Sequence, residues 1–196
     1  MKKIAIAALL SAVVAAPAFA ADNGFYAGVT LGEARASGAP AGGVLTKSND
    51  TVYGILGGYQ FDKNWGAEAF YTGAGKWAGQ DVAGTALASG KADVYGINAV
   101  YTFPLSDAFS LYGKLGYAHA KSTASCFLIA TGLPCGPAGV VGATRNAATY
   151  GLGGVYNVTP AIGIRLGWDR YAAAVNTGAT SNYNSNVYSL AGVYKF

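Results

Sequence analysis

Few residues in this chain could do acid–base chemistry, and His119 is its sole histidine. One arrangement that could make a hydrolytic site is a His and a Ser two residues apart on a strand, because alternate side chains share a face. Ser122 lies three residues from His119, so a strand would point the two side chains to opposite faces. The sequence therefore predicts that the protein is not an enzyme. His119 has the parity of Tyr117 and Leu115 and is expected among outward aromatic residues near one end of the fold.

The two cysteines, Cys126 and Cys135, lie in one segment that also contains Gly and Pro. No His or acidic residue accompanies them, so a metal site is not predicted, and no Gly-rich phosphate loop precedes a helix, so no cofactor is expected. In an exported chain this spacing favours a disulfide that closes a surface loop. The interior of that loop, residues 127–133, is apolar and could either contact a partner or pack on the rim of the fold.

Three ionisable residues, Glu68, Lys114 and Arg165, each lie within a segment of alternating residue types. In every case the charged residue shares a face with Gly, Ala, Ser or Thr and is opposite to the more apolar, aromatic face. Counted from the nearest tight turn, the three lie at similar depth. The pattern predicts a lumen charge cluster, which could be an interior plug or the gate of a narrow pore; the plug is the preferred interpretation.

These segments belong to a larger set of alternating stretches with the period of β-strands. The connections between them are in turn long and short, the long ones covering residues 33–50, 74–92, 121–146 and 170–185. Such alternation is typical of a barrel inserted into a membrane from one side. The predicted fold is all-β: an eight-stranded antiparallel up-and-down transmembrane β-barrel with short periplasmic turns and long extracellular loops. The predicted strands are residues 25–32, 52–61, 65–73, 95–103, 109–120, 150–158, 162–169 and 186–196.

A soluble barrel with an apolar interior is the alternative, because alternation alone does not say which face points inward. Eight strands enclose a lumen just wide enough for side chains, which disfavours placing all the large aromatic residues inside. A Lys or Arg on the lipid face at mid-depth would cost ~2–4 kcal/mol, and none has the parity of the aromatic face there. Both arguments favour the membrane barrel.

The N-terminus predicts export. Lys2 and Lys3 precede an apolar run, residues 4–16, and a small-x-small pattern at 18–20 predicts a cleaved signal peptide, residues 1–20, with cleavage between Ala20 and Ala21. A membrane-anchor helix is the alternative, but the run is short for a span and Pro17 follows it. The remaining residues, 21–196, are predicted to form one barrel domain. The signal holds two of the 13 basic residues, against 9 acidic ones, so no nucleic-acid partner is indicated.

The chain resembles the small eight-stranded barrels of the OmpA-type transmembrane domain, with the neisserial surface and opacity proteins as relatives. The resemblance rests on four stretches: 24–32 (GFYAGVTLG), 65–71 (WGAEAFY), 111–117 (LYGKLGY) and 194–196 (YKF). In that family an interior acid on the third strand pairs with basic residues of later strands, which implies pairing of Glu68 with Lys114 or Arg165. The resemblance also implies a C-terminal assembly signal at Tyr188, Leu190, Tyr194 and Phe196.

The same resemblance implies location in the Gram-negative outer membrane and two classes of function. The first is a structural or adhesin-like surface barrel that acts through four extracellular loops, with its lumen plugged by side chains. The second is a narrow porin or channel for ions or small solutes. The implied partners are outer-membrane lipid and lipopolysaccharide, the barrel-assembly machinery, and a host or surface ligand; the chain is expected to be a monomer.

Overall fold

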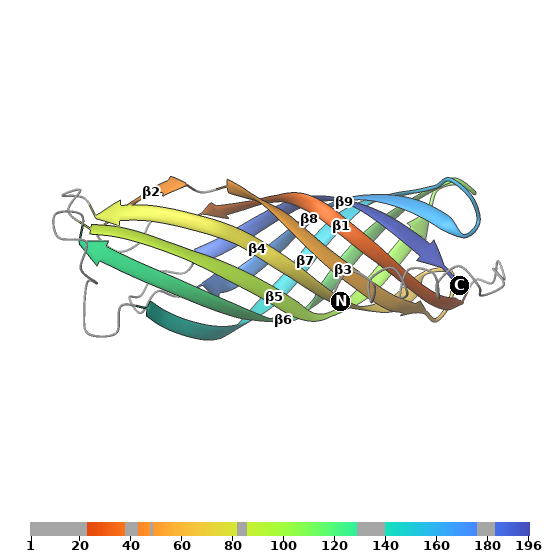
Figure 1. The fold of residues 1–196 in the computed structure, drawn as a ribbon. Helices are drawn as coiled ribbons and strands as arrows, with labels where there is room; N and C mark the ends of the chain where they lie inside the picture. Colours follow the sequence, from red (N-terminus) through yellow and green to blue (C-terminus); the bar gives the residue numbers. More distant parts are fainter. Residues whose placement is uncertain (1–22, 38–42, 48, 82–85, 129–139, 176–182) are drawn as a thin grey trace, which may run out of the picture.

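The computed structural model describes residues 23–37, 43–47, 49–81, 86–128, 140–175 and 183–196, and Figure 1 shows them as one long barrel of antiparallel strands. Among these residues, no helix is long and apolar enough to cross a membrane. The strands are β1 (Gly24–Ser37), β2 (Gly43–Lys47), β3 (Asn49–Gln60), β4 (Trp65–Asp81), β5 (Ala86–Pro104), β6 (Phe109–Leu128), β7 (Val140–Asn157), β8 (Ile162–Val175) and β9 (Tyr183–Lys195).

Eight of these strands close a ring in the order β1, β3, β4, β5, β6, β7, β8, β9 and back to β1. Closure is made by the first and last strands, which pair from Tyr26 with Lys195 to Ser37 with Asn184. The backbone N–H of Phe196 donates to the carbonyl of Phe25 at 2.9 Å and extends that seam. Among the described strands, the short β2 pairs with the far end of β4 alone. The predicted eight-stranded up-and-down barrel is confirmed, and its closure gives each strand of the ring two neighbours, as a sheet in lipid requires.

The orientation of the side chains confirms a barrel built for lipid. Large apolar residues point outward, such as Phe25, Val29 and Leu115, which are 66%, 67% and 66% exposed. Inward-facing residues are buried, such as Val94 and Ala118. Rings contact one another around the end at which β1 begins and β9 ends, as with Trp65 and Tyr101, whose centroids are 4.9 Å apart. This inside-out arrangement excludes the soluble alternative.

The strands are longer than the sequence predicted. β6 has 20 residues and β5 has 19, whereas a tilted strand needs ~9–11 to cross the hydrocarbon. The segments expected to be loops at 74–92 and 121–146 are therefore largely strand, and β5 and β6 stay paired out to Ala86 and Leu128. The predicted loop bounds were wrong there, because the strands extend into both segments. Beyond the membrane no lipid selects apolar residues, so Ala, Gly, Ser and Thr continue the ladder without an apolar pattern.

The three short turns, at the end of the barrel where β1 begins and β9 ends, share one local structure. The Asp62 carboxylate accepts the backbone N–H groups of Asn64 and Trp65 at 2.7 and 2.8 Å. The hydroxyls of Ser106 and Thr159 accept the N–H of the third residue that follows each of them, at 3.1 and 2.9 Å. Such side-chain to backbone bonds favour tight turns because they satisfy donors that have no strand partner. These hydrogen bonds fix the residue at which the next strand begins, and the inward positions of that strand are counted from this residue.

Candidate functional site in the barrel lumen

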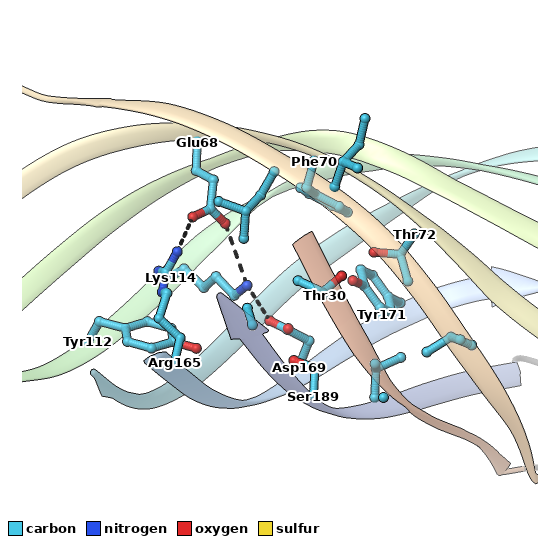
Figure 2. Close-up of a pocket in the computed structure, with 16 residues that line it drawn as sticks. Thr30, Glu68, Phe70, Thr72, Tyr112, Lys114, Arg165, Asp169, Tyr171 and Ser189 are labelled. Carbon is cyan, nitrogen blue, oxygen red and sulfur yellow. Dashed lines mark hydrogen bonds and ion pairs between the residues drawn. The ribbon is translucent and has the colours of Figure 1, made fainter. Parts of the chain in front are cut away.

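The structure brings Glu68, Lys114 and Arg165 together inside the barrel, as Figure 2 shows. They project inward from β4, β6 and β8, strands that are not adjacent in the ring. Arg165 Nη1 lies 2.6 Å from Glu68 Oε2, and Lys114 Nζ lies 3.6 Å from Glu68 Oε1. Glu68 is 1% exposed and Arg165 is 7% exposed. The contacts therefore cross the lumen and connect opposite walls.

A fourth charged residue, Asp169 on β8, completes the group, although it was not predicted as a member of the charge cluster. Its Oδ1 atom lies 3.0 Å from Lys114 Nζ, which is closer than Glu68 Oε1 at 3.6 Å. Asp169 has the same parity as Arg165, four residues further along the strand, so the alternation rule could have found it. The predicted strand ends at this residue, whereas the observed strand continues to Val175 and keeps Asp169 inside. Two acids and two bases make a group without net charge, hereafter the lumen quartet.

Two tyrosines pack against the lumen quartet. The guanidinium of Arg165 lies 4.3 Å from the centroid of the Tyr112 ring and 5.9 Å from that of Tyr26. Tyr26 also donates a hydrogen bond from its hydroxyl to Glu68 Oε2 at 3.3 Å. A planar guanidinium that is removed from water is stabilised when it stacks on the face of an aromatic ring. Arg165 is thus held by a carboxylate at one nitrogen and by aromatic rings beside its guanidinium.

Inward glycines make room for these tyrosine rings. A Cβ atom placed on Gly153 would lie 2.6 Å from the Tyr112 hydroxyl and would collide with the carbonyl of Leu166. Gly167 lacks room for a Cβ atom beside the same hydroxyl, and Gly58 lacks room beside the ring of Tyr26. Packing therefore explains why glycine occupies the lumen-facing positions opposite each tyrosine ring.

Further along the lumen, toward the outer end, the interior becomes apolar. Phe70 and Tyr171 have ring centroids 6.0 Å apart and pack with a buried group on several strands. Its members are Ala34, Val52, Val94, Ala118, Ala120, Ala147, Tyr171 and Val187. Between this layer and the lumen quartet lies a cavity of about 30 Å³, room for about one water molecule. Thr30, Thr72 and Ser189 line it together with the charged residues.

Toward the periplasmic turns the lumen opens into a vestibule of about 700 Å³. Its walls include Gln60, Lys63 and Lys195, and Arg165 lies at its inner end. Lys195 Nζ donates to Asn157 Oδ1 at 3.3 Å. Tyr26 also lines the vestibule, and Arg165 lines both the vestibule and the cavity of about 30 Å³.

The remaining predicted site residues are not part of this group. His119 lies on the outer face, where its Nδ1 atom is 2.7 Å from Asn146 Oδ1 and its ring is 5.4 Å from that of Tyr95. The predicted C-terminal assembly residues line the outer face of β9 and its end; Tyr188 and Leu190 are both 49% exposed. Cys135 and the cleavage site at Ala20 and Ala21 lie outside the described residues, so the disulfide with Cys126 and the signal cleavage stay predictions.

The sequence matches a family that has this fold. The family model for the outer membrane protein beta-barrel domain matches residues 6–196. The chain belongs to the outer membrane β-barrel family. It is 28% identical over 216 residues to outer membrane protein P5 of Haemophilus influenzae, an alignment that covers 100% of this chain and 61% of that protein. The chain thus spans about three fifths of the length of this curated relative.

Solved structures with the same fold include neisserial surface protein A, with a TM-score of 0.59 at 20% identity over 88% of this chain and 97% of that one. OprG from Pseudomonas aeruginosa gives 0.59 at 16% identity, over 91% and 99%. Ail of Yersinia pestis, solved with the heparin analogue sucrose octasulfate, gives 0.51 at 17% identity, over 88% and 99%. The predicted resemblance to small outer-membrane barrels is confirmed, and the family places the chain in the outer membrane.

Proposed function

We propose that this protein is a non-enzymatic surface barrel of the outer membrane, closed at mid-height, that acts through its outer end. The observation that supports this proposal is that two successive layers of side chains lie across the lumen. The lumen quartet, Tyr26 and Tyr112 occupy one level, the Phe70–Tyr171 layer occupies the next, and a cavity of about 30 Å³ remains between them. Conduction of hydrated ions needs a continuous wet path, which these two layers interrupt.

The outer end provides the surface for interaction. β5 and β6 remain paired well beyond the residues needed to cross the hydrocarbon, so the barrel wall projects from the membrane as a paired sheet. A rigid projecting wall costs less ordering entropy on binding than a flexible loop. An adhesin-like role through this part of the chain is the function that the shape supports best.

Single-channel conductance in a planar bilayer tests the closed lumen. We expect the refolded protein to be silent, and a Glu68→Ala variant to show brief conductance steps, because Arg165 and Lys114 would lose their shared partner. Steady conductance of the unaltered protein would contradict a closed lumen.

A second experiment tests the outer end. A variant in which a short turn replaces residues 123–143 should insert into lipid but lose binding to immobilised heparin, a probe chosen because Ail was solved with a heparin analogue. The Glu68→Ala variant should bind as the unaltered protein does. Equal binding by the shortened variant, or no binding by the unaltered protein, would contradict this role for the outer end.

The second candidate function is a narrow channel, and one observation favours it. Lys114 Nζ lies between two carboxylates, 3.0 Å from Asp169 and 3.6 Å from Glu68. A single ammonium with two acceptors can change its main partner at small cost, and such a change would open the level of the lumen quartet to the vestibule of about 700 Å³. Conductance that disappears in a Lys114→Met variant would support the channel.

A further inference from the structure

The vestibule at the periplasmic end contains a cation without an ionic partner. Lys195 has the inward parity of the buried Val193 on β9, and its side chain lines the vestibule. Within the part of the chain that the structure describes, its ammonium makes one hydrogen bond, to Asn157 Oδ1 at 3.3 Å, and no ion pair. An ammonium has more donors than this contact uses. Lys195 therefore keeps a positive charge and unused donors that a ligand can meet.

The groups around Lys195 leave its charge without compensation. Asn157 is neutral, and its Nδ2 donates to the backbone carbonyl of Asp107 at 3.5 Å, so its Oδ1 is the atom that accepts from Lys195. Arg165 lines the same vestibule and acts on Lys195 as a like charge. The charge of Arg165 is itself balanced by Glu68. The inner vestibule thus carries the uncompensated charge of Lys195.

The mouth of the vestibule carries charges of both signs. Lys63 lies in the turn between β3 and β4, and Asp107 lies in the turn between β5 and β6. The carboxyl group of Phe196 adjoins Gly24 in the wall, where the Phe196 N–H donates to the carbonyl of Phe25. Among the described residues, none of these groups forms an ion pair with Lys195. The mouth therefore has no excess of positive charge that would draw in a polyanion, and the inner cations disfavour a cationic ligand.

The walls of the vestibule suit a ligand with a short apolar body. Its volume of about 700 Å³ lies within the ~300–1,000 Å³ that is typical of small-molecule sites. Half-buried Val155 and Ala161 line it. The hydroxyls of Thr102 and Ser110, on β5 and β6, line it as well and can donate to a ligand. Apolar walls with a few polar groups and one cation favour a small amphipathic anion.

We propose that the vestibule binds an organic monocarboxylate with a short apolar body. The carboxylate accepts from the ammonium of Lys195, and the apolar part lies against Val155 and Ala161. Such a ligand enters from the periplasmic side, at the end of the barrel where β1 begins and β9 ends (Figure 1). A free short acid and the C-terminus of a polypeptide share this chemistry. This inference does not depend on the proposed function of the outer end.

Backbone amide signals in NMR spectra of the protein in zwitterionic micelles test the ligand class. We expect 4-methylpentanoate to saturate one site and to move the signals of Thr102, Ser110 and Asn157. Its amide, 4-methylpentanamide, lacks the charge, and acetate lacks the apolar body, so both should bind at least ~10-fold more weakly. Equal affinity for either of these two probes, shifts confined to the outer end, or the absence of saturation would overturn the proposal.

Variants of one residue test the place of the carboxylate. Lys195→Met should bind 4-methylpentanoate about 10-fold more weakly, because a charge-assisted hydrogen bond is lost, whereas Lys195→Arg should retain the binding. Lys63→Met removes the same charge at the mouth and is the matched control; its affinity should change less than ~3-fold. Amide signals outside the vestibule show whether each variant is folded. Unchanged binding by Lys195→Met, or an equal loss in Lys63→Met, would contradict the assignment.

Two peptides identify the source of the carboxylate. An acetylated tetrapeptide that ends in leucine is titrated once with a free C-terminus and once with an amidated one. Tighter binding of the free-ended peptide than of 4-methylpentanoate would assign the site to polypeptide ends, and weaker binding would assign it to free short acids. Equal binding of the free-ended and amidated peptides would show that the carboxylate is not recognised.

Discussion

At the scale of single residues, the buried charges of the lumen quartet determine which substitutions the barrel interior tolerates. Glu68 accepts from Arg165 and Tyr26, and Lys114 lies near its other oxygen atom. Removing one partner of a buried pair costs more than removing both, because a lone charge in a poorly hydrated site keeps its desolvation cost. The quartet therefore behaves as a unit in which single substitutions are the most damaging.

The first prediction concerns Arg165. An Arg165→Met variant should lower the free energy of unfolding by ~3–5 kcal/mol, since Glu68 would lose its shortest ionic contact and keep the longer one with Lys114. The Glu68→Gln/Arg165→Met double variant should lose clearly less than the sum of the two single changes. Urea unfolding in phospholipid vesicles measures all three. Lys195→Met, which removes a base outside the quartet, is the control and should cost ~0–1 kcal/mol; strict additivity in the cycle would contradict the coupling.

The second prediction is a pH dependence that originates in the first turn. The backbone N–H groups of Trp65 and Asn64 hold the pKa of the Asp62 carboxyl below its ordinary value. Because the folded pKa is the lower one, this stabilisation is complete above the unfolded pKa, ~3.9, and is lost as the pH falls through the folded pKa. We expect the urea midpoint of the unaltered protein to fall further on acidification below about pH 4 than that of Asp62→Asn.

Asn at position 62 keeps an acceptor oxygen but cannot be protonated in this range, so the two proteins differ in titration only. Parallel acid profiles for Asp62→Asn and the unaltered protein would show that other carboxylates dominate. The comparison is made in vesicles of zwitterionic lipid, so that the charge of the membrane changes little over this pH range.

Within and between strands, small residues decide how neighbouring strands and interior rings fit. Gly153 on β7 and Gly167 on β8 are direct partners, and both adjoin the hydroxyl of Tyr112 on β6. Their missing side chains create the space that the ring occupies in the middle of the lumen. Outward glycines such as Gly113 and Gly192 have open space within 4 Å of the position that a Cβ atom would take, so they carry no such constraint.

The third prediction uses this difference. Gly153→Ala should lower the free energy of unfolding by ~1–3 kcal/mol, because the new methyl group meets the Leu166 carbonyl and the Tyr112 hydroxyl. Gly113→Ala on the lipid side of β6 should be neutral or slightly stabilising, because Ala loses less conformational entropy than Gly when the strand folds. Thermal unfolding in detergent measures both; similar losses in both variants would show that strand propensity, rather than the fit of Tyr112, is the cause.

For the molecule as a whole, the barrel depends on one long-range seam. β1 and β9 are the first and last strands in sequence, and their pairing converts an open sheet into a ring. Phe196 lies at the end of that seam, with its N–H on the Phe25 carbonyl and its ring 5.1 Å from that of Tyr194. A closed ring is needed in lipid, where unpaired backbone groups have no water.

The fourth prediction separates closure from recognition during assembly. Phe196→Ala keeps the backbone bond, so the purified variant should refold with nearly unchanged stability. In cells we expect its amount in the outer membrane to fall severalfold, because the terminal aromatic residue is the predicted assembly signal. Phe103→Ala, an exposed aromatic residue at the same end of another strand, is the control. Equal losses for both variants, measured in membrane fractions, would point to the aromatic girdle instead.

Local alternation was enough to predict the eight strands of the ring and that Glu68, Lys114 and Arg165 each lie opposite the aromatic face. The narrow lumen of eight strands and the cost of a charge in lipid then decided which face meets lipid. These properties follow from a period of two that the lipid enforces residue by residue. The extent of each strand beyond the membrane emerged from the folded barrel alone, because outside the hydrocarbon no apolar pattern marks a strand. The place of Asp169 and the pairing of Lys76 with Lys91 likewise required the assembled sheet, since cross-strand register and a bulge join residues that local alternation leaves unconnected.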